Sequence, residues 1–512
     1  MDTANMFMLL AMAAYLAAVI GIGIAYARRN DAVGDFYLGG RKLGPVVTAM
    51  SAEASDMSSW LLMGLPGVAY LTGLADAGWT AIGLAAGTYL NWLAVARRLR
   101  IYSQTAGNAI TLPDFFSNRY RDSKKLLTWM SSAVILIFFI PYTAAGFAAC
   151  GRLFNSLFGV DYVSGMLLGA AVVVAYTAVG GFLAESASDL IQGIIMSIAL
   201  LAILIFALDW AGGPGAVIDR AGALPGYLSL TRSYDAVSRT AAAYGFVSII
   251  STLAWGLGYF GMPHILLRFM AIGDRKKLTL SRRIATVWVV VSLSVAVMIG
   301  LAGYALSADG GIPALAGSAS ETVILHLAEL LSRHGALCAL LAGVVLAGIL
   351  AATMSTSDSQ LLVASSSVSE NLLKECFGVR LSDRATLVVA RATVVLIAVI
   401  AAFIARDPAS SVFAIVSFAW AGFGASFGPV VLFALFWRRS TLSGALAGMV
   451  TGGVAVFAWK YLVRPLGGAW NIYELLPAFI AASAAIVLVS LLTKPPGRDI
   501  TEEFDAVART EN

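Results

Sequence analysis

Acidic and hydroxyl side chains, whose oxygen atoms can bind cations or protons, lie within segments that are otherwise apolar. Asp56 and Glu53 occupy one such segment, and a hydroxyl-rich run from Thr353 to Ser359 surrounds Asp358 in another. A carboxylate at membrane depth costs at least ~2.5–3.5 kcal/mol, so it needs a partner or a purpose. Hard cations such as sodium prefer oxygen ligands, which carbonyls, hydroxyls and carboxylates provide. These residue types therefore predict binding of a small cation inside a membrane.

The same residues also have structural interpretations, which remain open at this point. Asp56 can cap backbone amides that a helix break sets free. Serine and threonine runs in membrane helices often donate back to carbonyls of their own helix. Asp189 opens the predicted helix 188–209. There it is either an interfacial acid that the helix dipole favours or a residue on an ion path.

Composition puts these side chains in one large helical membrane bundle. The chain has 512 residues, of which 59% are hydrophobic and 12% are charged, and its mean hydropathy is +0.83. About 20 apolar residues suffice for one crossing, and uncharged stretches of about that length recur along the chain. We predict thirteen transmembrane helices, at 4–27, 44–73, 77–97, 126–151, 162–180, 188–209, 240–264, 283–306, 335–366, 388–406, 410–437, 440–460 and 472–493.

Lysine and arginine predict the orientation of these helices. With the N-terminus outside, 26 of the 34 Lys and Arg residues fall in inner loops and the inner tail, and the opposite orientation would reverse this ratio. The same topology accounts for the net charge of +5, so no nucleic-acid partner is predicted. The first apolar run has no basic segment before it and is expected to be a retained helix. We expect a multi-pass protein of a bacterial inner membrane with a cytoplasmic C-terminus.

Two of the predicted helices are interrupted at their centres. Helix 44–73 contains the polar stretch 51–59, and helix 240–264 contains the glycine-rich stretch 255–263. Unwound backbone is stable at membrane depth only beside a cavity or an ion, and glycine and proline favour such a break. Each broken helix opens a set of five, and because five is odd, the second set enters from the opposite side. The pattern predicts an all-α integral membrane protein with a 5+5 inverted-repeat core and a site near the midplane.

The predicted organisation has five parts. These are an extra helix with an inner loop at 1–43, a first repeat at 44–209, an outer loop at 210–239, a second repeat at 240–437, and two helices with a charged tail at 438–512. A short lid helix is expected within 314–330. The nucleotide-binding pattern GxxxxGK[ST] does not occur in the sequence, so uphill transport would have to use an ion gradient.

Three aromatic residues are predicted at mid-helix depth rather than at the membrane interfaces: Tyr142, Trp255 and Tyr259. Trp255, Tyr259 and Pro263 stand four apart, so they would share one face of a regular helix. Beside a break, such a face can form an apolar wall around a small ring or aliphatic group. The alternative is that these rings serve packing, as most mid-helix aromatics do.

Three stretches resemble the sodium/solute symporter family. They are SDMSSWLLMGLPG at 55–67, AWGLGYFGMPH at 254–264 and Met354-Ser355-Thr356. The first two are long and specific, and the similarity extends over nearly the whole chain. The resemblance implies the inverted-repeat fold typified by the bacterial leucine transporter, with extra helices at both ends. It also implies sodium-coupled symport, with L-proline as the expected substrate, Na+ as the coupling ion and no other cofactor.

The resemblance also implies roles for individual residues. Sodium would be held by backbone oxygens of Ala54, Met57 and Ala352 and by the hydroxyls of Ser355 and Thr356, and Asp56 matches an acid essential in the family. The residues that match a proline pocket are Ser58, Gly64, Tyr142, Trp255, Tyr259 and Pro263. Arg41 matches an inner-side residue implicated in coupling.

The sequence departs from the family pattern at three places. Glu53 and Asp358 stand where small or uncharged residues are expected, and the turn 181–189 is unusually acidic. Some family members hold a second sodium with an acid matching Asp189. A second cation site is therefore predicted here, formed by Asp189, Ser355, Asp358 and Ser359, with a proton shared between the carboxylates as the alternative.

These observations predict a secondary active transporter rather than an enzyme. We expect sodium-coupled uptake of L-proline by alternating access, by a protein that works as a monomer in the lipid bilayer. One alternative is a sodium symporter of another small solute, such as a different amino acid, sialic acid, pantothenate or a sugar. The other is a membrane protein that senses a solute, against which the lack of an attached signalling domain argues.

Overall fold

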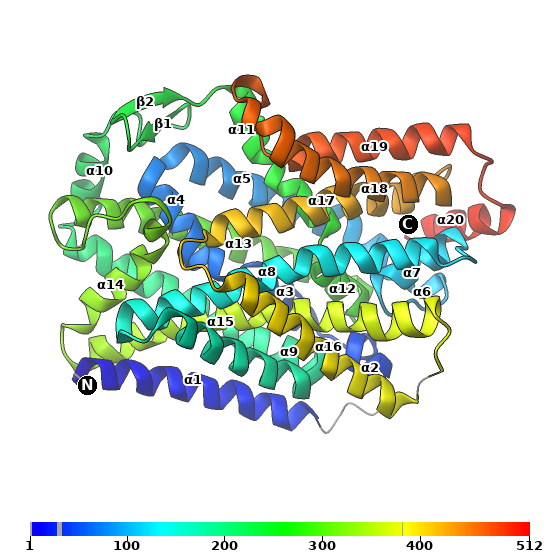
Figure 1. Ribbon diagram of the computed structural model, residues 1–512, viewed down its shortest axis with the longest axis horizontal. Coiled ribbons are helices and arrows are strands. Elements are labelled where there is room, and N and C mark those ends of the chain that lie inside the picture. Colours follow the sequence, from blue (N-terminus) through cyan, green and yellow to red (C-terminus); the bar gives the residue numbers. More distant parts are fainter. Residues whose placement is uncertain (1–2, 28–32, 381, 512) are drawn as a thin grey trace.

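The computed structural model describes residues 3–27, 33–380 and 382–511. Most of them are helical, and the long helices lie roughly along one axis of the molecule (Figure 1). The helices are α1 (Thr3–Ala27), α2 (Val33–Leu38), α3 (Pro45–Asp56), α4 (Leu65–Thr72), α5 (Leu74–Leu90), α6 (Ala96–Thr105), α7 (Leu112–Tyr120), α8 (Leu126–Phe158), α9 (Tyr162–Trp210), α10 (Pro214–Gly222), α11 (Phe246–Leu253), α12 (Pro263–Ala271), α13 (Leu278–Ala308), α14 (Val323–Ser332), α15 (Ala336–Ser366), α16 (Asp383–Ala405), α17 (Val412–Phe436), α18 (Leu442–Ala458), α19 (Leu475–Leu492) and α20 (Arg498–Glu511). Two short strands, β1 (Arg232–Asp235) and β2 (Thr240–Ala243), form an antiparallel hairpin.

Among the described residues, nine helices are long and apolar enough to cross a membrane, or ten if the bent pair α11–α12 forms one span. The other predicted spans are 44–73, 77–97 and 162–180. The structure forms the first from α3 and α4 and the second from α5 and α6, with π-helical turns in between. The third is the apolar helix Tyr162–Ala178, which is shorter than a typical span.

The ends of several helices follow from local side-chain chemistry. Asp161, Ser411 and Thr441 accept hydrogen bonds from the third residue after them and so begin α9, α17 and α18. Thr111 and Asp114 form a reciprocal capping box that begins α7. Gly181, with φ of 65°, divides α9 into two halves, because a left-handed residue cannot continue a right-handed helix.

The first broken segment joins α3 to α4. α3 ends at Asp56, Met57 leaves the helical conformation with ψ of 70°, and a π-helical turn covers Trp60–Gly64 before α4. Thr48–Asp56 are all buried. The break therefore lies inside the bundle, where its freed backbone groups need partners from the protein or a ligand.

The second broken segment joins α11 to α12 through a 3₁₀-helix at Ala254–Gly261. The segment Phe246–Gly261, which contains α11 and the 3₁₀-helix, is bent by 47° relative to α12. Pro263 is the first residue of α12, where its missing N–H has no helical acceptor to lose. The glycines allow close packing: a Cβ on Gly258 would lie 1.9 Å from Trp420 Nε1, and one on Gly256 would lie 2.2 Å from the Gly83 carbonyl oxygen.

The structure corrects some predicted boundaries. Residues 240–243 are strand β2 rather than the start of a helix, because they pair with Arg232–Asp235. The second broken helix does not end at 264; α12 continues to Ala271, since Pro263 begins a helix instead of ending one. The charged tail forms the amphipathic helix α20, which packs on α6.

Two ends of the molecule differ in what they carry. The β1–β2 hairpin, α10 and α14 lie toward one end, and α6, α7 and α20 lie toward the other (Figure 1). α14, with the 3₁₀-helix Gly317–Thr322 before it, falls in the region where a lid helix is predicted. Between the ends, α15 packs on α9, α1 and α8, and α17 packs on the 3₁₀-helix of the second break.

Candidate cation and substrate site

The end of α3 meets the middle of α15 through a buried carbonyl and a hydroxyl. Ser355 Oγ donates to the Ala54 carbonyl oxygen at 2.7 Å and lies 3.3 Å from the Ala352 carbonyl oxygen. In a continuing helix the Ala54 oxygen would accept from the Ser58 amide, but that amide donates to the Asp56 oxygen at 2.9 Å. The break therefore leaves a carbonyl that α15 reaches.

Thr356 adds a further oxygen beside Ser355 on α15. Its hydroxyl is buried and has no hydrogen-bond partner among the described residues. Met57, the C-terminal cap of α3, is fully buried. Buried polar groups are almost always satisfied, so this hydroxyl is available to a ligand. Carbonyls and hydroxyls that converge at a buried position suit a small, hard cation.

Asp56 links the two broken segments. Tyr259, in the 3₁₀-helix of the second break, donates its hydroxyl proton to Asp56 Oδ2 at 2.6 Å. Tyr142 from α8 and the indole of Trp60 approach the Asp56 backbone oxygen at 3.4 Å. Asp56 Oδ1 is buried and has no partner among the described residues. The carboxylate therefore joins α3 to the second break and keeps one oxygen for a further donor or a cation.

Trp255 lies within a cluster of aromatic rings. Its ring stacks on Tyr473 with centroids 5.0 Å apart and an angle of 22°, and it lies 5.2 Å from Phe413. Trp60 and Trp420 are 6.2 Å and 6.4 Å away. Gly64 borders the same cluster, because a Cβ there would lie 3.2 Å from Phe413 Cβ. The cluster forms an apolar wall beside the Asp56–Tyr259 contact, because Trp420 also packs on Tyr259 with ring centroids 5.1 Å apart.

The pairing of Trp255, Tyr259 and Pro263 on one face does not occur. The segment that holds Trp255 and Tyr259 is a 3₁₀-helix with three residues per turn, so residues four apart are not aligned. Pro263 lies beyond the bend and lines a small cavity with Tyr37 and Pro113, which neither aromatic ring lines. Ser58 is buried, and its hydroxyl accepts from the Trp60 amide at 3.4 Å.

A second polar cluster forms around Arg268 of α12. Arg268 is fully buried and pairs with Glu185 and with Asp189 Oδ2, the latter at 3.2 Å. It also donates to Ser359 Oγ at 2.7 Å and to Ser51 Oγ at 3.1 Å. The sequence interpretation assigned Arg268 to an inner loop and so did not include it in any site. The structure instead makes it the centre of a network that joins α3, α9, α12 and α15.

Asp189 and Asp358 each keep one oxygen without a partner. Asp189 Oδ2 also accepts from Ser51 at 2.6 Å, while Asp189 Oδ1 is unpaired among the described residues. Asp358 accepts from the Ser359 amide at 2.7 Å through Oδ1, and its Oδ2 is likewise unpaired. Asp189 lies well inside the second half of α9 and is fully buried, so it is not an interfacial acid at a helix start. Three buried carboxylates around one arginine leave an excess of negative charge for a cation or protons to balance.

Glu53 forms its hydrogen bond outside both oxygen clusters. Its Oε1 accepts from the Trp92 indole at 2.8 Å, and its Oε2 has no partner within the described chain. Trp92 lies in the π-helical turn between α5 and α6, so this bond ties α3 to that turn.

Arg41 ties together three segments at the end of the molecule that carries α6 and α7. Its guanidinium donates to the Met270 carbonyl oxygen at 2.6 Å, the Ala109 carbonyl oxygen at 2.7 Å and Ser103 Oγ at 3.2 Å. Burial, reinforced by the charge of Arg100, lowers the pKa of Arg41 to about 10, so it stays protonated at neutral pH. Arg41 thus holds the end of α12 against the α6–α7 connection.

Glu321, which precedes α14, joins α8 to the start of α17. Glu321 pairs with Arg152 of α8 and accepts from the amides of Val412 and Phe413 at 2.9 Å and 3.0 Å. Ser411 donates to it at 2.7 Å. The lid therefore caps α17, whose Phe413 and Trp420 contact Trp255.

Several of these residues are absent from the predicted sites. Glu185 stands four residues before Asp189, so the two share one face of a helix, but the predicted helix begins at 188 and leaves Glu185 outside it. Phe413 and Trp420 stand seven apart on α17, which is again one face. That spacing could have indicated the wall opposite Trp255.

Comparison with known proteins finds relatives over nearly the whole chain. The family model "Sodium:solute symporter family" matches residues 36–452. The sodium/proline symporter of Haemophilus influenzae is 45% identical over 499 residues, with 96% of this chain and 95% of that protein covered. The high-affinity proline transporter PutP of Bacillus subtilis is 43% identical over 485 residues, with 94% of this chain and 98% of that protein covered.

A solved structure shares the fold. A Na+-coupled sialic acid symporter in a substrate-bound, outward-open state superimposes with a TM-score of 0.78 at 17% identity, covering 96% of this chain and 99% of that one. The two proteins therefore have the same overall fold. The chain belongs to the sodium:solute symporter family. It is therefore a multi-pass membrane transporter and not an enzyme.

Proposed function

We propose that this protein carries L-proline into the cell together with Na+, by alternating access. The observation that carries the proposal is the junction of Ser355 with the freed Ala54 carbonyl oxygen, 2.7 Å apart and beside the unpaired Thr356 hydroxyl. The proline transporters that resemble the chain over nearly its whole length support the choice of substrate.

The sodium ion would bind between the end of α3 and α15. Its ligands would be the backbone oxygens of Ala54, Met57 and Ala352 and the hydroxyls of Ser355 and Thr356. A cation there would be coordinated by both the Ser355 hydroxyl and the Ala54 carbonyl oxygen, in place of the hydrogen bond between them. Coordination would hold the backbone at the break after α3 in one conformation. The negative charge of Asp56, the residue before Met57, would attract the cation to this place.

The substrate would bind between the two breaks, against the aromatic cluster around Trp255. Tyr142 and Tyr259 both contact Asp56 and would also contact the substrate. Ser58 and Gly64 would line the pocket from the facing segment. Because sodium fixes the segment that carries Asp56 and Ser58, each ligand raises the affinity for the other by the same factor. That reciprocal coupling lets the sodium gradient drive uptake.

The full topology is part of the proposal. We infer thirteen crossings in a 5+5 inverted-repeat core, with the N-terminus outside, the C-terminus in the cytoplasm of a bacterial cell, and a monomer as the working unit. Pro263 and Arg41 would then face the cytoplasmic side, and Glu321 with the lid would face the outside. Release to the cytoplasm requires the Arg41 contacts to open.

A second cation would bind at Asp189, Ser355, Asp358 and Ser359, or a proton would be shared there. The unpaired oxygens Asp189 Oδ1 and Asp358 Oδ2 support this part of the proposal. The test is the transport current of Asp358→Asn. One charge per proline in the unmodified protein, with unchanged sodium dependence in the variant, would contradict a second cation.

Uptake of radiolabelled proline into proteoliposomes tests the main proposal. Accumulation should require an inward sodium gradient, should be lost with potassium alone, and should collapse in Thr356→Ala. Sodium-driven uptake of another amino acid, a sialic acid, pantothenate or a sugar, without proline uptake, would reject the substrate and keep the coupling. Binding without accumulation of any solute would favour a sensor.

A further inference from the structure

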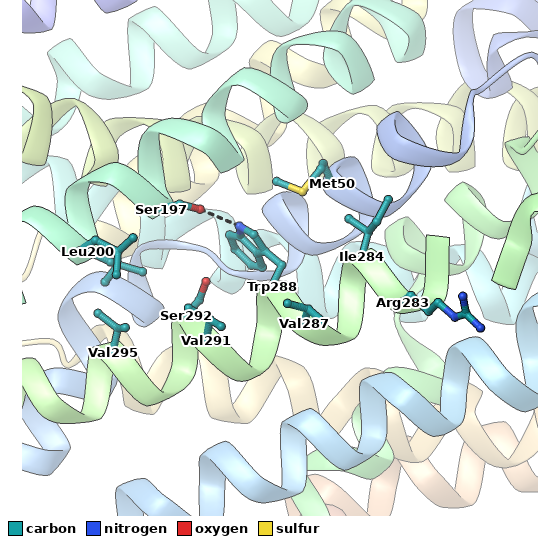
Figure 2. Close-up of a pocket in the computed structure, with 11 residues that line it drawn as sticks. Met50, Ser197, Leu200, Arg283, Ile284, Val287, Trp288, Val291, Ser292 and Val295 are labelled. Carbon is teal, nitrogen blue, oxygen red and sulfur yellow. Dashed lines mark hydrogen bonds between the residues drawn. The ribbon is translucent and has the colours of Figure 1, made fainter. Parts of the chain in front are cut away.

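A long apolar groove runs along the side of the bundle between α3, the second half of α9, and α13. It encloses about 530 Å³, and most of the side chains that line it are apolar (Figure 2). Met50 comes from α3, Leu200 from α9, and Val287, Val291 and Val295 from α13. The groove is open to the surroundings, since Val287 and Val291 are 64% and 46% exposed.

Few polar side chains line the groove, and two of them pair with each other. The Trp288 indole N–H donates to Ser197 Oγ at 2.8 Å, which pairs both polar groups across α13 and α9 (Figure 2). Ser292 also lines the groove and is buried. An occupant therefore meets hydrocarbon, and the groove selects an apolar chain rather than a polar solute.

The groove lies at hydrocarbon depth. The second half of α9 and α13 are both long and apolar enough to cross a membrane, within the segments Gly181–Trp210 and Arg275–Ala308. At that depth the abundant apolar molecules are lipid acyl chains. A hollow between three helices holds such a chain more firmly than a convex, lipid-facing surface does, because more atoms contact it.

A positive charge stands at one end of the groove. Arg283 lines it, is exposed, and makes no hydrogen bond or ion pair with any residue that the structure describes. Its guanidinium points away from the aliphatic lining in Figure 2. Lys276 and Lys277 lie in the turn before α13, at the same end. Basic residues at the end of a membrane helix attract anionic headgroups, at about 1 kcal/mol each.

We propose that this groove is a binding site for one anionic phospholipid, with an acyl chain along α13 and the headgroup phosphate on Arg283. The occupant would contact α3, which carries Ala54 and Asp56, together with α9 and α13. Binding would thus stabilise the arrangement of the helices around the cation site. The inference does not depend on which solute the protein transports.

The test is native mass spectrometry of the purified protein with phosphatidylglycerol or phosphatidylcholine of the same acyl chains. The unmodified protein should retain one phosphatidylglycerol about fivefold more than phosphatidylcholine, which corresponds to about 1 kcal/mol. Arg283→Gln should abolish this preference, whereas Lys277→Gln, which removes a neighbouring charge outside the groove, should keep it. Equal loss in both variants would show general surface attraction and overturn the site.

The groove itself is tested by a matched pair of substitutions. Val291→Trp fills the groove, while Val290→Trp adds the same bulk to a neighbouring residue of similar exposure that does not line it. Retention of the lipid should be lost in the first and kept in the second. The rise in melting temperature on adding phosphatidylglycerol should follow the same pattern. If Val291→Trp retains the lipid and still gains melting temperature on adding phosphatidylglycerol, the proposal is overturned. If Val291→Trp fails to fold, the lipid preference of Arg283→Gln decides the proposal.

Discussion

At the scale of single residues, the Ala54 carbonyl oxygen shows how a break creates a binding group. The oxygen is free because the Ser58 amide donates to Asp56, and Ser355 is the hydroxyl that reaches it. Neither event depends on an unusual residue type. A small hydroxyl on α15 becomes a candidate ligand only because a neighbouring segment has unwound beside it.

Replacing Ser355 should weaken sodium binding without unfolding the protein. Ser355→Ala removes a hydroxyl next to the proposed ion, and a hydrogen bond or ligand contact to a charged group is worth about 1.5–3 kcal/mol. The sodium concentration for half-maximal proline uptake should therefore rise by roughly 10- to 100-fold. Ser366→Ala is the matched control on the same helix, since that hydroxyl donates back to the Val363 carbonyl oxygen. Equal effects in the two variants would remove Ser355 from the site.

Glu185 should matter for stability because it accepts hydrogen bonds from both Arg268 and Ser359 inside the bundle. A buried donor that loses its acceptor costs about 1–3 kcal/mol, and more when the donor is charged. Glu185→Ala should therefore lower the midpoint of thermal unfolding by several degrees. The exposed pair of Arg333 with Glu329 is the comparison, and Glu329→Ala should change the midpoint little. A small effect of Glu185→Ala would mean that Asp189 alone suffices for Arg268.

Sequence patterns identified single residues where type and location were both unusual. Asp56, Asp189 and Asp358 stood out because carboxylates are rare in apolar segments. Arg268 did not, because it was assigned to a loop, and a loop arginine needs no explanation. The partner of a buried acid depends on how distant helices pack, so the contact of Arg268 with Glu185 could not be read from spacing.

At the scale of elements, glycine and proline marked the second break well. The stretch 255–263 was expected to leave the α-helical conformation, and the structure forms a 3₁₀-helix followed by a bend of 47°. The predicted C-terminal end of this broken helix, at 264, is seven residues too early, because the prediction places Pro263 at the end of a helix. A proline at the first position of a helix starts it, and the two cases look alike in sequence.

Gly258 should be essential to the packing of the second break. A Cβ there would lie 1.9 Å from Trp420 Nε1, which donates to the Trp255 carbonyl oxygen at 2.8 Å. Overpacking of this kind typically costs about 1–3 kcal/mol. Gly258→Ala should therefore displace Trp420 and lower both the melting temperature and proline uptake.

The control for that substitution is Gly245→Ala. Gly245 precedes α11 with φ of −77°, and a Cβ there meets nothing within 4 Å. It should leave the melting temperature and the uptake nearly unchanged. If Gly258→Ala behaves like Gly245→Ala, the 3₁₀-helix can shift away from α17, and the close contact is not required.

At the scale of the whole molecule, the bent pair α11–α12 decides the topology. It forms one span or a re-entrant loop, and the two cases differ by one crossing. Between the β1–β2 hairpin and the end of α15, the chain passes through this pair, α13 and α15. Three crossings would put the two points on opposite sides of the membrane, and two would put them on the same side.

Cysteine labelling of intact cells separates these cases. Val237, in the hairpin, is 95% exposed, and Phe377, just beyond the inner end of α15, is 65% exposed. In a background with Cys150, Cys338 and Cys376 replaced by alanine, an impermeant maleimide should label Val237→Cys in intact cells and Phe377→Cys only after permeabilisation. Labelling of both in intact cells would make the bent pair re-entrant and rule out the inverted repeat. The reverse pattern would keep three crossings and invert the orientation, so that the Arg41 contacts would face the outside.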